Sequence, residues 1–124
     1  MNRNRLGNID NKYQRFDKHR RVLCVCSAGL LRSPTIALVL SQHPYNYNTR
    51  AVGIDQEFAL IPIDAVLVEW ADEIVCADYK QFTYISEKWP DRTVINLNIP
   101  DSYDYRDNEL IAMIKHKYDD AVSL

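Results

Sequence analysis

The residue types with the most chemical potential lie in one short segment, Cys26-Ser27-Ala28-Gly29-Leu30-Leu31-Arg32-Ser33-Pro34. A cysteine thiolate is a nucleophile, and the planar guanidinium of Arg32 can bind two oxygens of an anion at once. The Ser33 hydroxyl can donate a hydrogen bond to the Cys26 sulfur and so help it to leave. Five residues separate Cys26 from Arg32, and this arrangement points to phosphoryl transfer in which an arginine supplies the charge that metal ions supply elsewhere.

The elements on either side give this segment its setting. Residues 22–26 form a continuous β-favouring run, typical of a strand buried on both faces, and Ser33-Pro34 is a typical helix start. Residues 27–32, here named the anion loop, must then lie at a helix N-terminus, where backbone N–H groups and the helix dipole favour an anion. Gly29 allows a positive φ there, and the same field favours the thiolate form of Cys26. We predict that phosphate is bound by Ser27, Ala28, Gly29, Leu30, Leu31, Arg32 and Ser33.

The rest of the chain alternates between predicted strands and helices. We expect strands over residues 22–26, 49–54, 73–77 and 93–99, and helices over residues 35–42, 63–70, 78–89 and 107–121. Asp78 and Gln81 form a capping-box-like start for the third helix. This alternation predicts an α/β fold, a three-layer sandwich with a four-stranded parallel sheet and helices on both faces, and with the phosphate-binding loop after the first strand. Ligands of such sheets bind beyond the carboxyl ends of the strands.

Hydrolysis of a phosphoester also needs a proton donor for the leaving group. Asp101 follows the fourth predicted strand in Ile99-Pro100-Asp101-Ser102-Tyr103, so we expect it at the same edge of the sheet as Cys26. The nearby carboxylates of Asp104 and Asp107 compete for this role. Asp101 could also be an ordinary turn residue, since Pro-Asp is a common turn dipeptide.

Other residues are weighed against purely structural roles. Cys24 and Cys76 are expected to be core residues, with Cys24 facing away from Cys26. The three histidines are scattered without the spacing of metal ligands, and we expect neither a metal nor a cofactor. Four aromatic residues could line the mouth of the site and stack on an aryl phosphate, with partial burial on the surface as the alternative for each: Tyr45, Tyr47, Phe58 and Tyr103.

From residue 21 to about residue 118 the chain resembles the low-molecular-weight protein tyrosine phosphatases, and within them a compact subgroup of predicted enzymes. The resemblance rests on the motifs Val-Leu-x-Val-Cys, Arg-Ser-Pro-Thr, Trp-Ala-Asp-Glu-Ile and Ile-Pro-Asp-x-Tyr. It implies a metal-independent phosphomonoester hydrolase, a protein tyrosine phosphatase with a cysteinyl-phosphate intermediate. In that case Cys26 is the nucleophile, Arg32 the phosphate clamp, Ser33 the thiolate partner and Asp101 the general acid. The dual-specificity phosphatases do not fit, because their acid precedes the cysteine by tens of residues.

Three positions depart from the family pattern. Leu31 stands where many members have a second cysteine, so the disulfide that protects the nucleophile is absent. Gly29 replaces an asparagine that organises the loop. Asp104 replaces one of two aromatic residues beside the substrate, and its charge would repel a dianionic substrate unless Arg106 pairs with it.

Two other functions use the same anion loop. The Cys-Ser-Ala-Gly start is similar to that of the sugar phosphotransferase IIB proteins, phosphocarriers that form phosphocysteine, but those proteins lack an equivalent of Arg32. A non-catalytic phosphate-binding module is the second alternative.

Composition and charge limit the partners. The chain has 124 residues, 47% of them hydrophobic and 26% charged, as in one globular domain. Residues 1–21 carry a net charge of +5 and the remainder −7, so a basic, partly disordered extension (residues 1–20) precedes a phosphatase-like α/β domain (residues 21–124). The acidic domain argues against nucleic acid as the main partner, whereas the basic arm leaves it open.

The same features bear on location and substrate. We find no membrane span and no signal peptide, and three cysteines are too few for a disulfide scaffold, so we expect a cytoplasmic protein. The expected substrate is a phosphotyrosine protein or a small aryl phosphate, with inorganic phosphate as the product and no membrane partner.

Overall fold

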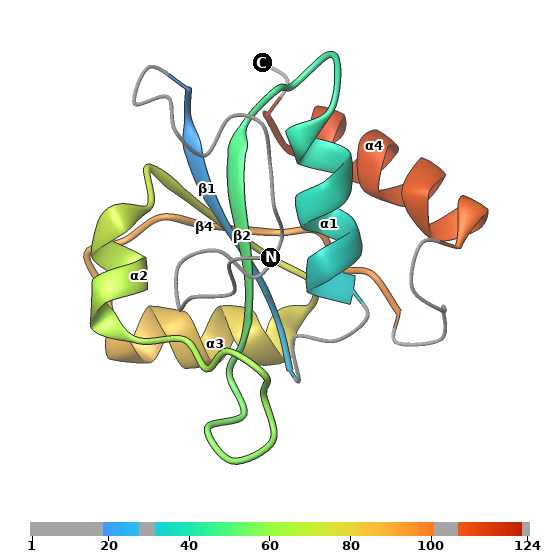
Figure 1. The fold of residues 1–124 in the computed structure, drawn as a ribbon. Helices are drawn as coiled ribbons and strands as arrows, with labels where there is room; N and C mark the ends of the chain where they lie inside the picture. Colours follow the sequence, from blue (N-terminus) through green and yellow to red (C-terminus); the bar gives the residue numbers. More distant parts are fainter. Residues whose placement is uncertain (1–18, 28–31, 101–106, 123–124) are drawn as a thin grey trace.

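A four-stranded parallel sheet in the order β2-β1-β3-β4 organises the chain (Figure 1). The computed structural model describes residues 19–27, 32–100 and 107–122, so the predicted basic extension lies almost wholly outside the described residues. The elements are β1 (Arg21–Cys26), α1 (Arg32–Ser41), β2 (Asn48–Gly53), α2 (Ala65–Trp70), β3 (Glu73–Cys76), α3 (Tyr79–Lys88), β4 (Val94–Asn96) and α4 (Asn108–Val122). Within the described ranges, none of these helices is long and apolar enough to cross a membrane.

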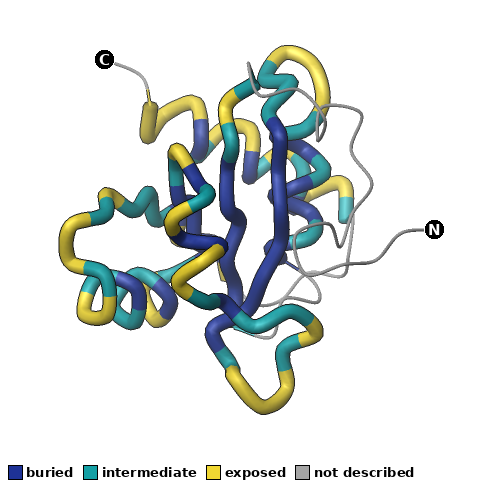
Figure 2. Tube along the Cα trace, turned by 60° about the vertical axis from the view of Figure 1, so that its left-hand side comes forward, coloured by how far each residue is buried: buried dark blue, intermediate teal, exposed yellow. Residues whose placement is uncertain are grey.

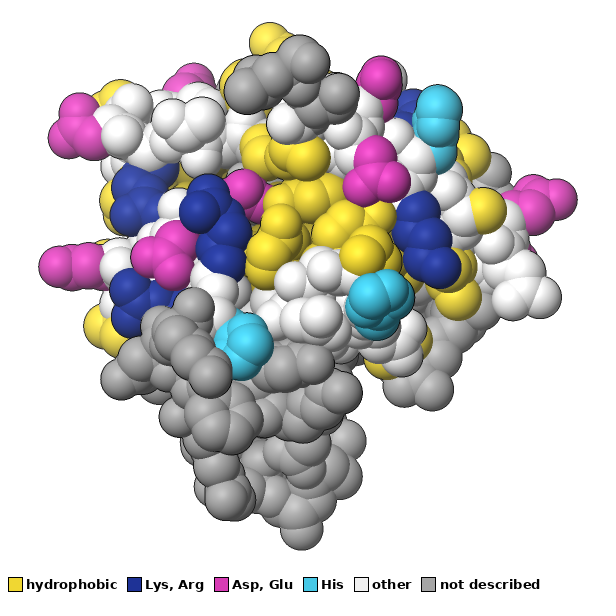
Figure 3. Space-filling view, turned by 90° about the horizontal axis from the view of Figure 1, so that it is seen from above, with side chains coloured by type: hydrophobic (Ala, Val, Ile, Leu, Met, Phe, Trp, Pro, Cys, Tyr) yellow, Lys and Arg dark blue, Asp and Glu magenta, His cyan; other side chains and the backbone are white. Residues whose placement is uncertain are grey.

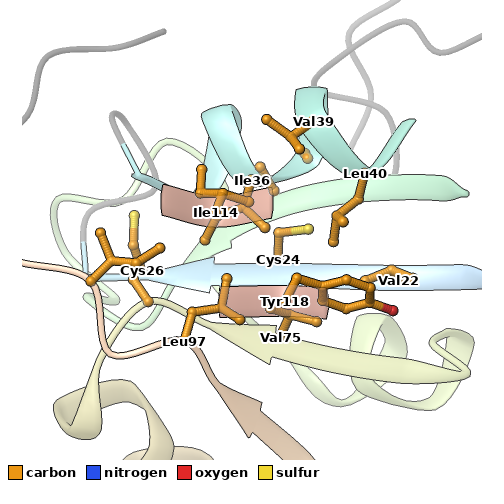
Figure 4. Close-up of a cluster of buried hydrophobic side chains, with 14 of the residues drawn as sticks. Val22, Cys24, Cys26, Ile36, Val39, Leu40, Val75, Leu97, Ile114 and Tyr118 are labelled. Atoms are coloured by element: carbon orange, nitrogen blue, oxygen red, sulfur yellow. The ribbon is translucent and has the colours of Figure 1, made fainter. Parts of the chain in front are cut away.

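Two clusters of buried side chains lie on opposite faces of this sheet, because successive residues of a strand point to opposite sides. On one face, Val22, Cys24 and Cys26 of β1 pack against α1 and α4 (Figure 4). On the other face, Leu23 and Val25 pack against side chains of α2 and α3. The predicted three-layer sandwich is therefore confirmed, and Figure 2 shows its central strands as continuously buried.

The position of Cys24 corrects one expectation. Cys24 is a core residue, as predicted, but it shares the face of β1 that carries Cys26. Residues two apart in a strand point the same way, so the prediction that Cys24 faces away from Cys26 is wrong.

Helix α1 begins at Arg32, three residues before its predicted start. Pro34 is compatible with this earlier start, because the N–H groups of the first helical turn have no intrahelical acceptor. Ser33 therefore lies inside the helix and does not cap it from outside. Its side chain is fully buried and faces β1.

The amino end of β1 lies at the top of Figure 1, at the other end of this strand from Cys26, and Figure 3 shows the molecule from that side. The hydroxyl of buried Tyr118 donates a 2.8 Å hydrogen bond to Glu73 Oε2, and Arg20 Nη2 lies 3.1 Å from Glu73 Oε1. The rings of Tyr45 and Tyr47 pack around that of Tyr118, at centroid distances of 5.4 and 6.1 Å. The suggestion that these two tyrosines line the mouth of the site is wrong, because they follow the C-terminus of α1 and the anion loop precedes its N-terminus.

Substitution of Ile114 tests the packing of α4 against the sheet. It is fully buried in the cluster that contains Cys26, and replacing a buried isoleucine by alanine costs about 2–5 kcal/mol. We expect Ile114→Ala to lower the free energy of unfolding in urea by that amount. Val122→Ala, at a position of the same helix that is 40% exposed, should change it by less than about 0.5 kcal/mol. Equal effects of the two variants would contradict the packing of α4.

Candidate active site

Backbone hydrogen bonds bring the carboxyl ends of the strands together around Cys26. The carbonyl of Cys26 accepts a 3.0 Å bond from the N–H of Ile54, just after β2. On the other side of β1, the N–H of Ala77 donates to Val25 O at 2.9 Å, and the N–H of Ile99 donates to Ala77 O at 2.6 Å. The segments after β2, β3 and β4 therefore all meet at the end of β1, next to Cys26.

Cys26 and Ser33 lie side by side across the anion loop. The distance from Cys26 Sγ to Ser33 Oγ is 3.2 Å. Ser33 is fully buried and Cys26 is only 4% exposed, so the hydroxyl and the sulfur are held together by packing. When the sulfur is a thiolate, this geometry allows the Ser33 hydroxyl to donate to it.

The guanidinium of Arg32 is buried between the ends of β3 and β4. Arg32 is 3% exposed, and its Nη1 donates to Asp78 Oδ2 at 2.6 Å and to the carbonyl of Ile99 at 2.9 Å. These two acceptors hold one of the three guanidinium nitrogens, Nη1, in place. A phosphoryl group bound in bidentate fashion would have to use Nε and Nη2.

Asp78 is ionised by these contacts. Burial alone would raise the pKa of its carboxyl, but the hydrogen bonds from Arg32 and from the backbone N–H of Lys80 outweigh burial and hold the pKa below its usual value. An aspartate with a lowered pKa gives up its proton well below neutral pH, so Asp78 is unsuited to the role of general acid.

The thiols of Cys24 and Cys76 are made unreactive by their surroundings. Burial raises the pKa of Cys76 to about 12, and the charge of Asp78 adds to this. Burial, followed by the nearby Glu73, raises the pKa of Cys24 well above its usual value. Both thiols therefore stay protonated at neutral pH. Among the described residues, no group of three or more His, Cys, Asp and Glu side chains could hold a metal ion.

Phe58 lies in the loop between β2 and α2, on the same edge of the sheet as Cys26. The carboxylate of Asp55 accepts 3.0 Å bonds from the N–H groups of Glu57 and Phe58, and the Asp55 N–H donates to Ser27 O at 2.9 Å. Phe58 is 72% exposed, and the loop that carries it projects at the bottom of Figures 1 and 2. The structure thus brings Phe58 to the correct edge, with its ring in solvent.

Several predicted site residues lie outside the described residues. They are Ala28, Gly29, Leu30 and Leu31 of the anion loop, and Asp101, Tyr103, Asp104 and Arg106 after β4. Asp107 is described, and its carboxylate accepts a 2.8 Å bond from the N–H of Glu109 in the first turn of α4. Asp107, one of the three carboxylates considered for the general acid, therefore has a structural role at the start of α4.

Two residues that contact the anion loop, Asp78 and Gln81, were not among the predicted site residues. Asp78 and Gln81 were interpreted only as the start of a helix, and the structure confirms that capping box. It also shows Asp78 bound to Arg32, and Gln81 Nε2 donating to Ser27 Oγ at 3.0 Å. Their position directly after a strand, at the edge where ligands bind, was the signal that could have identified them.

No family model and no curated protein sequence matches this chain, but solved structures share its fold. YwlE arginine phosphatase from Geobacillus stearothermophilus is 17% identical, with a TM-score of 0.57 over 79% of this chain and 85% of that one. Vibrio vulnificus Wzb, in complex with benzylphosphonate, is 17% identical, with a TM-score of 0.61 over 83% and 94%. A mutant of YwlE arginine phosphatase with a phosphorylated active-site serine is 17% identical, with a TM-score of 0.53 over 82% and 88%.

These proteins are low-molecular-weight protein tyrosine phosphatase family members. The present chain has their α/β fold. The likeness, at this level of identity, concerns the fold, and it agrees with the architecture that the sequence resemblance implied.

Substitution of Asp78 tests its pairing with Arg32. Asp78→Asn keeps a good helix cap but removes the charge, and we expect it to lower the free energy of unfolding at pH 7 by about 1–3 kcal/mol. The folded-state pKa of Asp78 lies below its usual value of 3.8, so the ion pair stabilises the protein above that pH and is lost as the pH falls through the lower value. In urea unfolding from pH 7 to pH 2.5, the difference between wild type and variant should shrink only at the acid end. A difference that is constant with pH would contradict the pairing.

Proposed function

We propose that this chain is a cysteine-dependent phosphomonoester hydrolase of the low-molecular-weight protein tyrosine phosphatase type. One observation carries the proposal: Cys26 ends the central strand with Ser33 Oγ 3.2 Å from its sulfur, while Arg32, in the same helical turn as Ser33, is anchored to Asp78. A nucleophile, a hydroxyl that stabilises it and an arginine are thus gathered at one helix N-terminus, where anions bind.

In the proposed mechanism, Cys26 Sγ attacks phosphorus in line with the ester oxygen. The S–P bond forms as the P–O bond to the substrate breaks, and Asp101 gives its proton to the departing oxygen. Asp101 then takes a proton from water, which attacks the cysteinyl phosphate and releases inorganic phosphate and the thiolate. Throughout, Arg32 and the N–H groups of residues 27–33 stabilise the equatorial oxygens, and Ser33 donates to the sulfur as it leaves.

The assignment of Asp101 as the acid is supported by chain connectivity. The carbonyl of Ile99 accepts a hydrogen bond from Arg32, and Asp101 follows only two residues later. Two residues span at most about 7 Å, which keeps the Asp101 backbone close to the arginine. The lowered pKa of Asp78 and the capping role of Asp107 leave the other described carboxylates in this region with structural functions.

The structural neighbours support a phosphorylated substrate. Wzb binds benzylphosphonate, in which a methylene group joins a phenyl ring to the phosphonate, and the YwlE mutant carries phosphate on its active-site serine. We favour phosphotyrosine proteins or small aryl phosphates, with Phe58 and Tyr103 beside the ring. Hydrolysis of phosphoarginine is the second candidate, because two of the neighbours are arginine phosphatases.

The proposal also covers the domain bounds, the location and the cofactor requirement of the enzyme. Residues 21–124 would be the phosphatase domain, acting in the cytoplasm without metal or cofactor. The free thiols of Cys24, Cys26 and Cys76 are consistent with a reducing compartment.

The test is hydrolysis of an aryl phosphate in the presence of EDTA. Cys26→Ser should abolish turnover, and Arg32→Ala should lower it by at least about 10²-fold, because the transition-state charge loses its main partner. Asp101→Asn should lower turnover by about 10²–10⁴-fold, the usual contribution of a general acid. EDTA should have no effect. Phosphotyrosine and phosphoarginine peptides, assayed in parallel, choose between the two substrate classes.

Cys24→Ala is the matched control, because it removes a thiol two residues away on the same face of β1 and should keep wild-type turnover. Full activity of Cys26→Ser would eliminate cysteinyl-phosphate chemistry. A stable phosphocysteine that passes to another protein with negligible hydrolysis would favour the phosphocarrier. Phosphate binding without any turnover would favour the non-catalytic module.

A further inference from the structure

One turn of α3 holds the anion loop at both of its ends. Of the six residues 27–32, only the first and the last, Ser27 and Arg32, have polar side chains. Asp78 accepts from Arg32 at 2.6 Å, and Gln81 Nε2 donates to Ser27 Oγ at 3.0 Å. We propose that Gln81 is a positioning residue that keeps the beginning of the anion loop in place for phosphate.

The orientation of the Gln81 amide is determined by its surroundings. Its oxygen faces the backbone N–H of Asp78 at 2.7 Å, and a backbone N–H can only donate. The amide NH₂ must therefore point to the other neighbour, the Ser27 hydroxyl. Gln81 is fully buried, so packing holds the side chain in this bridging position.

Ser27 is restrained from two directions. Its carbonyl accepts a 2.9 Å bond from the N–H of Asp55, in the loop after β2, and its hydroxyl binds Gln81 on α3. The four residues that follow, Ala28, Gly29, Leu30 and Leu31, have no side-chain hydrogen-bonding groups. The side-chain hydrogen-bonding groups of the loop are thus those of Ser27 and Arg32, and both are bound to the same helical turn.

This role rests on the proposed function and adds a residue to it. A loop that binds an anion through backbone N–H groups is effective when those groups already converge before the anion arrives. Loss of the bond between Ser27 and Gln81 frees the residue next to Cys26. Both phosphate binding and transition-state stabilisation should then weaken together.

A double-mutant cycle tests the bond. Ser27→Ala and Gln81→Met should each lower kcat/KM for an aryl phosphate about tenfold, the contribution of one hydrogen bond. The double variant should lose no more than either single variant, because all three lack the same contact. Protection of Cys26 against iodoacetamide by inorganic phosphate gives a second measurement, and half-protection should need about tenfold more phosphate in all three. Burial raises the pKa of Cys24 and Cys76, so their thiols stay protonated at the pH of the assay, and labelling should report Cys26 alone.

Tyr118→Phe is the matched control, since it removes a buried hydrogen bond at the opposite pole. It should lower stability and keep wild-type kcat/KM and phosphate protection. Ser27→Ala leaves the capping box of α3 intact, so it decides the question even where Gln81→Met does not fold. Wild-type values for Ser27→Ala, or additive losses in the double variant, would overturn the role of Gln81. A wild-type protein without phosphatase activity would instead overturn the proposed function, and phosphate protection would still test Gln81.

Discussion

The site depends on a buried positive charge that must have a carboxylate beside it. Arg32 is 3% exposed, and an unpaired guanidinium in such a place would be strongly unfavourable. Asp78 provides the compensating charge because it is the N-cap of α3, a position fixed by the hydrogen bond to Lys80 N. The pairing requires α1 to start at the end of β1, and α3 to start at the end of a neighbouring strand. The adjacency of β1 and β3 in the parallel sheet satisfies both requirements.

The two ends of the sheet use their polar groups differently. At the amino end, Glu73 binds both Tyr118 and Arg20, and the Tyr118 hydroxyl also contacts that of Tyr47. Burial, with the hydrogen bonds to Tyr47 and Glu73, raises the pKa of Tyr118, so its hydroxyl remains a donor at neutral pH. At the carboxyl end, the side chains of Asp78 and Gln81 point to the ends of one loop. The side chains of Glu73, Tyr118 and Tyr47 thus bind groups of the framework itself, whereas Asp78 and Gln81 bind a loop at the edge where ligands of such sheets lie.

The sequence predicted the fold well, because its signals are periodic and local: alternating strands and helices, a buried first strand and a typical helix start. Details set by distant partners were harder to predict. The start of α1 at Arg32 reflects contacts with Asp78 and Ile99, more than 40 residues away. Gln81 was recognised as a cap, but its bond to Ser27 spans 54 residues. The wrong prediction that Cys24 faces away from Cys26 does not depend on distant partners. The two-residue period of a strand already places the two side chains on one face.

The three cysteines show how the proposed nucleophile differs from the other two thiols. Cys24 lies inside β1 and Cys76 is the last residue of β3, and burial raises the pKa of both thiols, so that they stay protonated at neutral pH. Cys26 shares a strand and a face with Cys24, but it is the last residue of β1, and the helix that returns from the anion loop brings the Ser33 hydroxyl to 3.2 Å from its sulfur. The spacing between Cys26 and Arg32 thus belongs to the junction between β1 and α1. Elsewhere in the sheet, the same residue types would be part of the core.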